Sequence, residues 1–203
     1  RLNHLGRHWV VSNGYGRRVG VTNVSQSFNT RVRGPEDHNM LVLRRDGEVV
    51  RDLPVCTALL QHGQRSGGDL AYATGALLRC GGTDWFRTLI LLAERFVLVI
   101  DRIHVMEPDL ESGHIEWNCL GEVTASEAGF RLSQQGVYMD VLSDSGWATQ
   151  LGVADQSADW KRTLDSGAYP YAKFPLPKLI FQMPGLEVGQ SYCLVTLLGA
   201  TDS

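Results

Sequence analysis

The stretch from Trp85 to His104 constrains the fold of this chain more than any other part of it. It holds two apolar runs, 88–92 and 96–100, which are rich in Leu, Ile and Val and are separated by the short polar segment Ala93-Glu94-Arg95. Runs this short are typical of strands rather than helices. The stretch therefore predicts a β-hairpin with adjacent strands at 88–92 and 96–103. Because neither run alternates apolar with polar residues, we expect covering layers on both faces, at the centre of a large sandwich.

The same stretch is not a membrane span. A transmembrane helix needs about 20 consecutive apolar residues, and here Glu94 and Arg95 interrupt the run. We expect Leu91 to lie so deep in the sandwich that an aspartate in its place would prevent soluble expression, because an unpaired buried charge is costly.

The rest of the chain reads as further antiparallel strands. Asp46-Gly47 is a hairpin turn signal, and 114–119 alternates polar and apolar residues as a half-exposed strand does. We expect 178–182 and 192–198 to pair with each other and close the sheet, and no stretch has the pattern of a long amphipathic helix. The prediction is an all-β fold, a large antiparallel β-sandwich of the supersandwich kind, with residues 1–203 as a single domain.

Charge is distributed unevenly along the chain. The net charge is −3, but residues 1–51 carry nine Arg against four acidic residues. Arg suits carboxylate and sulfate groups, although a G+C-rich genome gives the same bias with no functional meaning. The basic residues are not interleaved with exposed aromatic residues, so we expect no nucleic acid partner.

The cysteines and several other residues each have a structural interpretation. The wide spacing of the cysteines excludes a zinc knuckle or redox motif, which leaves buried free thiols, or disulfides in one of three connectivities. Trp117 and Trp147 could stack on sugar rings, but buried sandwich aromatics are more common. We expect Asp101 to form a structural ion pair with Arg102. The cysteines are Cys56, Cys80, Cys119 and Cys193.

Four motifs, taken in order, resemble the C-terminal β-sandwich of the heparinase II/III-like polysaccharide lyases. They cover nearly the whole chain, from about Trp9 to Leu198. The motifs are His38-Asn39 before an apolar strand, Arg87 with a run that ends in Val99-Ile100-Asp101-Arg102-Ile103, His114-Ile115-Glu116-Trp117, and the strand Leu194-Val195-Thr196-Leu197-Leu198.

The resemblance implies a two-part enzyme. An α/α toroid precedes the sandwich, and an anionic polysaccharide such as a glycosaminoglycan lies in the cleft between them. The reaction it implies is β-elimination: a uronate carboxylate is neutralised, a base removes the neighbouring C5 proton, and an acid, commonly Tyr, protonates the departing oxygen. We therefore expect the chain to be the C-terminal part of a longer periplasmic or secreted protein, inactive alone, with its catalytic residues unknown from this sequence.

Two loops and the start of one strand are the candidate substrate site. Polar, glycine-rich loops are where binding groups commonly sit. The resemblance places the basic loops at the cleft, and the alternative for their arginines is solvated surface charge. The expected substrate-binding residues are Tyr15, Arg17, Arg31, Arg33 and Asn39.

The resemblance also implies a structural zinc in the sandwich, with His38 as one ligand. Asn13 stands where the family has an Asp, and an amide is a poor zinc ligand beside a carboxylate. The first His of the set should lie further upstream than His8. The alternative is that His38 hydrogen-bonds a neighbouring loop.

Two functional classes remain open at this point. One is a polysaccharide lyase fragment that lines a substrate cleft, and the other is a non-catalytic sandwich that binds carbohydrate or packs against a partner domain. Upstream sequence with paired amphipathic helices and a Tyr-containing motif would favour the lyase.

Overall fold

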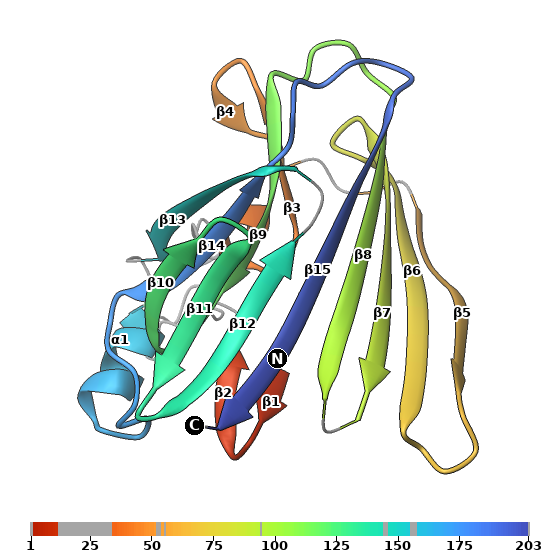
Figure 1. Cartoon of the computed structure of the whole chain (residues 1–203). Helices are drawn as coiled ribbons and strands as arrows, with labels where there is room; N and C mark the ends of the chain where they lie inside the picture. Colours follow the sequence, from red (N-terminus) through yellow and green to blue (C-terminus); the bar gives the residue numbers. More distant parts are fainter. Residues whose placement is uncertain are drawn as a thin grey trace, which may run out of the picture.

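Two antiparallel sheets that face each other form the body of this protein (Figure 1). The computed structural model describes residues 2–11, 34–51, 54, 56–93, 95–143, 146–154 and 158–202. Strands dominate these residues, and the helical elements among them are the short η2 (Pro35–Asp37) and α1 (Ala158–Asp165). The predicted all-β sandwich is confirmed.

The larger sheet has eight strands and contains the predicted hairpin at its centre. Its order is β10-β11-β12-β15-β8-β7-β6-β5, with antiparallel pairing throughout. The hairpin strands β7 and β8 pair from Leu92 opposite Phe96 to Thr83 opposite Val105. The strand bounds are Cys56–Gln64 (β5), Leu70–Cys80 (β6), Thr83–Leu92 (β7), Phe96–Val105 (β8), Glu122–Ser126 (β10), Gly129–Gln134 (β11), Val137–Ser143 (β12) and Ser191–Asp202 (β15).

The smaller sheet has five strands in the order β13-β14-β9-β3-β4. Asp46 and Gly47 both have positive φ and join β3 to β4, as the turn signal predicts. A separate hairpin, β1 (Leu2–His4) with β2 (Arg7–Val10), touches this sheet through a bridge from Val10 to Cys119. The bounds in the smaller sheet are Leu41–Arg45 (β3), Glu48–Val49 (β4), Ser112–Asn118 (β9), Ala148–Ala154 (β13) and Leu176–Gln182 (β14).

The main core lies between the two sheets. Phe130 of the larger sheet meets Phe181 of the smaller one edge to face, with ring centroids 5.5 Å apart. Ile103, Ile115 and Leu194 are fully buried beside them. Burial of these apolar side chains drives the two sheets together.

Full cover on both faces of β7 and β8 was the wrong expectation. Leu89 and Leu91 are 43% and 45% exposed, whereas Val99, directly opposite Leu89 in the ladder, is 1% exposed. Side chains opposite each other point to the same face of a sheet, so the cover ends between these two strands. Figure 1 shows the reason: the smaller sheet lies over one side of the larger sheet, and β5, β6 and β7 extend beyond it.

Two further expectations are corrected by the topology. The strands β14 and β15 do not pair with each other, because β14 lies between β13 and β9 while β15 lies between β12 and β8. The half-exposed pattern expected for β9 is wrong at its polar residues Glu116 and Asn118, which are as buried as their apolar neighbours, whereas His114 is partly exposed. Sequence alternation marks the two faces of a strand but not what covers each face.

The described helices are short. Among the described residues, no helix combines the length and the apolar character that crossing a membrane requires.

All four cysteines are free thiols. The expectation that they are buried holds fully for Cys119 alone, since Cys56 and Cys193 are exposed. Burial raises the pKa of the Cys119 thiol far above its ordinary value, so this side chain stays protonated and unreactive.

Uneven cover predicts different costs for two apolar truncations in the hairpin. Ile103→Ala leaves a cavity in the core and should lower the free energy of unfolding by about 2–5 kcal/mol. Leu91→Ala, at a half-exposed position, should lower it by about 1 kcal/mol or less. Urea denaturation followed by tryptophan fluorescence measures both, and equal losses would contradict the uneven cover.

Thiol accessibility gives a second check on the fold. In the native protein, iodoacetamide should modify Cys56 and Cys193 quickly and leave Cys119 unmodified until denaturant is added. Peptide mass spectrometry of the alkylated protein reads each site separately. Native modification of Cys119 at the rate of Cys193 would be inconsistent with the described core.

Candidate functional site

The segment that leads into β3 is held in place by the side chain of Asn39. Its Nδ2 donates to the carbonyl oxygen of Val11 at 3.1 Å, and its Oδ1 accepts from the backbone N–H of Asn118 at 2.7 Å. One amide thus ties the segment to the end of β2 and to the end of β9. The hydrogen-bonding capacity of this side chain is directed at main chain rather than at solvent.

Arg87 holds the same segment from the core side. Its Nη1 donates to the carbonyl oxygen of Asn39. Its Nε and Nη2 form a bidentate ion pair with the carboxylate of Asp101, at 2.7 and 3.0 Å. Asp101 is fully buried, and it lies directly opposite Arg87 in the β7–β8 ladder. Planar guanidinium and carboxylate groups in this geometry form a strong, well-oriented pair.

Two tryptophans complete this group, which we call the Arg87 cluster (Asn39, Trp85, Arg87, Asp101 and Trp117). The guanidinium of Arg87 lies 4.8 Å from the ring centroid of Trp85 and 4.8 Å from that of Trp117. Trp85 also donates its indole N–H to Asp101 at 2.7 Å. Because Trp117 belongs to β9 and the other cluster side chains on strands belong to β7 and β8, the cluster joins the two sheets.

The Arg87 cluster corrects one expectation and supports another. Asp101 pairs with Arg87 rather than with Arg102, because neighbouring residues in a strand point to opposite faces. Trp117 is buried, as expected of a sandwich aromatic, and the guanidinium of Arg87 lies over its ring.

A cavity of about 330 Å³ opens next to the cluster, on the part of the larger sheet that the smaller sheet leaves uncovered. Its lining includes Trp85 and Arg87 of β7, Leu77 of β6 and Leu59 of β5. The charge of Arg87 is already balanced by Asp101, so the cavity wall is apolar with a neutralised cation at one edge.

A second buried group holds the same segment from the outer face of the smaller sheet. Glu116 forms ion pairs with Lys178 at 3.0 Å and with His114 at 3.3 Å. Lys178 also donates to the carbonyl oxygen of Glu36 in η2. The side chain of Glu36 is in turn paired with Arg51. Segment 34–40 is therefore anchored on both sides of the smaller sheet, by Arg87 through Asn39 and by Lys178 through Glu36.

The predicted site residues are only partly described. Tyr15, Arg17, Arg31 and Arg33 lie outside the described residues. His38 is half-buried within the anchored segment, and Asn39 is the hydrogen-bonding residue at its end. The structure thus places Asn39 within the Arg87 cluster, and His38 precedes it in the same anchored segment.

The described residues do not form a metal centre around His38. No group of three or more His, Cys, Asp or Glu side chains in the described ranges could hold a metal ion. Asn13, the other position of the implied zinc set, lies outside those ranges.

Sequence reasoning missed the roles of Lys178 and Glu116. A lone Lys near the start of an apolar strand and a Glu in an alternating strand both read as solvent-facing. Their only signal was that each lies within a strand next to apolar residues, and their pairing depends on β14 lying beside β9.

Comparisons with known proteins bear on the fold. No family model and no curated protein matches the sequence. Solved structures do: heparan sulfate lyase HepC from Pedobacter heparinus has a TM-score of 0.69 at 16% identity, and a heparinase III gene product has a TM-score of 0.70 at 13% identity. Each match covers 98% of this chain and 29% of the other chain. A further heparinase III structure matches with a TM-score of 0.66 at 11% identity.

At these identities the likeness establishes the fold. The sandwich has the fold of the C-terminal part of the heparinase III structures, and the predicted resemblance is confirmed at that level. This chain spans less than a third of the length of the proteins that it matches.

The Arg87 cluster predicts a large cost for removing its carboxylate. Asp101→Ala leaves the guanidinium of Arg87 and the indole N–H of Trp85 without their acceptor, and should lower the free energy of unfolding by about 3–5 kcal/mol. Asp69→Ala removes an exposed pair with Arg65 and should cost about 1 kcal/mol or less. Chemical denaturation of both variants measures the difference, and an equal cost would contradict a buried, cluster-forming Asp101.

Proposed function

We propose that this chain is the C-terminal sandwich of a polysaccharide lyase that degrades a uronate-containing anionic polysaccharide by β-elimination. The observation that carries the proposal is the likeness of almost the whole chain to the corresponding part of solved structures named heparan sulfate lyase and heparinase III. The match covers under a third of those proteins, which is consistent with a second part that holds further catalytic groups.

The anchored segment 34–40 is the part of the sandwich that we assign to the cleft wall. It follows directly on residues 31–33, and two largely buried side chains, Arg87 and Lys178, fix it from both faces of the smaller sheet. Rigid support of this kind lets neighbouring residues keep a defined position toward a substrate. In this proposal Tyr15, Arg17, Arg31 and Arg33 contact the polysaccharide, and Asn39 keeps the wall in place.

The division of the chemistry follows from the residues available. Elimination needs a group that neutralises the uronate carboxylate, a base for the C5 proton and an acid for the departing oxygen, all close to one sugar. We assign these steps mainly to an α/α toroid that precedes the sandwich, with arginines of the basic loops adding positive charge at the cleft. The sandwich alone then cleaves nothing, and the whole protein acts in the periplasm or outside the cell.

Elimination leaves a 4,5-unsaturated uronate, whose ultraviolet absorbance can be followed directly. The full-length protein should raise this absorbance on at least one member of a panel of uronate polysaccharides, and residues 1–203 alone should not. A neutral glucan serves as the substrate control, because it carries no carboxylate to acidify the C5 proton. If the full-length protein raises the absorbance on no member of a broad panel, the result would instead favour a non-catalytic carbohydrate-binding sandwich.

The basic loops provide the matching variant test. Arg31→Ala with Arg33→Ala should weaken polysaccharide binding more at low salt than at high salt, because salt screens exposed charges. The control is Arg65→Ala with Arg131→Ala, which removes the same formal charge from exposed positions in the β5–β6 connection and in β11. An equal loss of binding in both double variants would argue against a specific role of the loops.

A further inference from the structure

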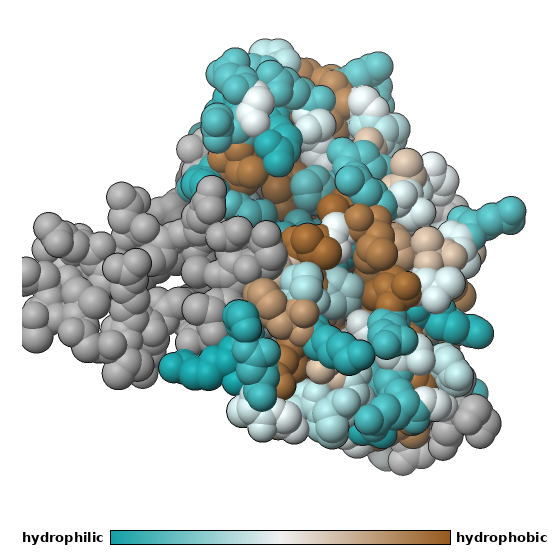
Figure 2. Space-filling model, turned by 90° about the vertical axis from the view of Figure 1, so that its left-hand side faces the viewer, coloured by the Kyte–Doolittle hydropathy of each residue, from teal (hydrophilic) through white to brown (hydrophobic). Residues whose placement is uncertain are grey.

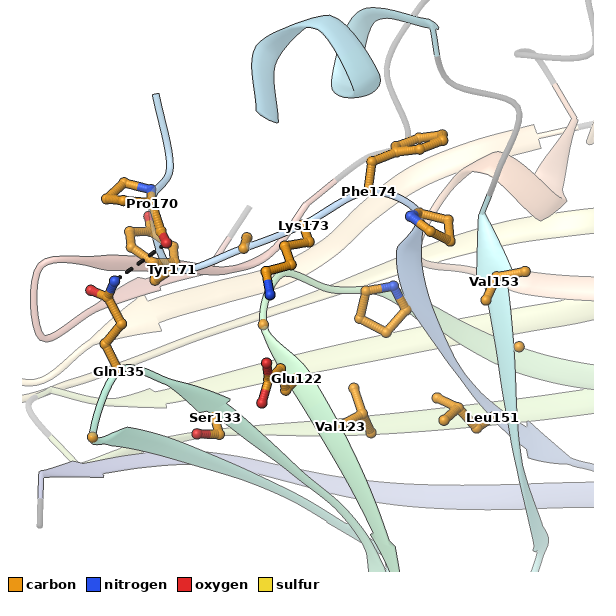
Figure 3. Close-up of a pocket in the computed structure, with 16 residues that line it drawn as sticks. Glu122, Val123, Ser133, Gln135, Leu151, Val153, Pro170, Tyr171, Lys173 and Phe174 are labelled. Carbon is orange, nitrogen blue, oxygen red and sulfur yellow. Dashed lines mark hydrogen bonds between the residues drawn. The ribbon is translucent and has the colours of Figure 1, made fainter. Parts of the chain in front are cut away.

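A groove of about 610 Å³ lies where the edges of the two sheets approach each other. Edge strand β10 of the larger sheet forms one wall, and edge strand β13 of the smaller sheet forms the other. Residues 170–175, which we call the strap, lie between α1 and β14 and form the third side (Figure 3). None of the lining residues belongs to the Arg87 cluster or to segment 34–40.

The walls of the groove expose apolar surface. Leu151 and Val153 of β13 are 47% and 59% exposed, and they line the groove together with Val123 of β10. Figure 2 looks onto the side of the molecule where β10 and β13 lie, and it shows apolar side chains at the surface among polar ones. Pro175 of the strap and Pro177 of β14 add further apolar lining.

Two opposite charges point into the groove from different walls. Lys173 extends from the strap toward Glu122 of β10, as Figure 3 shows. Neither side chain forms a hydrogen bond or ion pair with any other residue that the structure describes. The groove therefore presents three ammonium donors on one wall and a free carboxylate acceptor on another.

The groove is held open by contacts of its own. The hydroxyl of Tyr171 accepts from the backbone N–H of His8 at 3.3 Å, and the guanidinium of Arg7 lies 4.6 Å from its ring centroid. Gln135 donates to the carbonyl oxygen of Pro170 at 3.3 Å, which links the β11–β12 turn to the strap and closes one end (Figure 3). A preformed cavity of this size is typical of small-ligand sites.

We propose that this groove is a binding subsite for a short stretch of acidic sugar chain. Lys173 pairs with the carboxylate of a uronate ring, Glu122 accepts hydrogen bonds from ring hydroxyls, and the apolar faces of the sugars pack on Leu151 and Val153. The choice of an acidic sugar rests on the proposed function. The subsite would hold the chain at a place on the sandwich separate from the anchored segment.

An extended peptide fits the groove less well. Only 151–153 of β13 line it, which is too short a run for strand addition. The prolines of the strap have no N–H to offer a peptide backbone. The hydrogen bond from Gln135 to Pro170 closes one end, so a peptide could not run through. Sugars bind without a continuous ladder of backbone hydrogen bonds, and a short sugar chain suits the compact volume of the groove.

A site-resolved experiment follows from the lysines, of which the chain has three: Lys161, Lys173 and Lys178. The full-length protein is acetylated with an amine-reactive reagent, with and without a hexasaccharide of alternating glucuronate and N-acetylglucosamine. At a probe concentration ten times its Kd, acetylation of Lys173 should slow about tenfold by mass action. Lys161, exposed on α1, should be unaffected, and a neutral glucose hexasaccharide should protect Lys173 far less.

Variants of the opposite wall complete the test. Glu122→Gln should raise the probe concentration needed for half-protection of Lys173 about tenfold, because a charge-assisted hydrogen bond is lost. Glu127→Gln, an exposed glutamate in the β10–β11 turn, is the matched control and should change nothing. The subsite would be overturned if the hexasaccharide did not slow acetylation of Lys173, or if Glu122→Gln left the concentration for half-protection unchanged. Protection of Lys173 by an unstructured peptide in place of the sugar would also overturn it.

The outcome is separable from that of the proposed function. Elimination activity is measured on the same protein by ultraviolet absorbance. Activity without protection of Lys173 would reject the groove alone, and protection without activity would reject the lyase while keeping the subsite.

Discussion

The buried pair between Arg87 and Asp101 is the interaction on which the arrangement of this sandwich depends. Removing two charges from water is costly, and the pair is stable only because its hydrogen-bonding groups find partners. Here the carboxylate accepts from the guanidinium and from Trp85, while the guanidinium also binds the main chain of Asn39 and lies against two indole rings. These partners come from both sheets, so the pair fixes how one sheet lies on the other.

Segment 34–40 shows how the fold converts packing into a defined position for functional groups. Arg87 reaches it through the core, and Lys178 reaches it from the opposite face of the smaller sheet. Two charged anchors on one short segment leave it little freedom to move relative to the sheet. In the proposed lyase, where the sandwich would form one wall of a substrate cleft, such a fixed segment would keep the sugar in register with groups on the other side.

The unequal size of the sheets has a second consequence. Where the five-stranded sheet ends, the larger sheet keeps apolar side chains such as Leu89 and Leu91 half exposed. Where the edges of both sheets meet, the groove beside Lys173 forms. Exposed apolar surface can mark an interaction site, and in the proposed lyase it would face another part of the protein or the polysaccharide.

The sequence by itself determined the class of fold and the central hairpin. Short apolar runs with a polar reversal specify adjacent strands, because strand length and turn chemistry are local properties, and Asp46-Gly47 specified its turn for the same reason. The order of motifs also indicated the heparinase-like sandwich, with Arg87 and Asp101 among its residues. Only the tertiary structure decided which strands became neighbours, that Asp101 pairs with Arg87 instead of Arg102, that Glu116 is buried with Lys178, and that Leu91 lacks cover. Each of these depends on contacts between residues far apart in the chain, and a local pattern carries no record of which distant segment will lie over it.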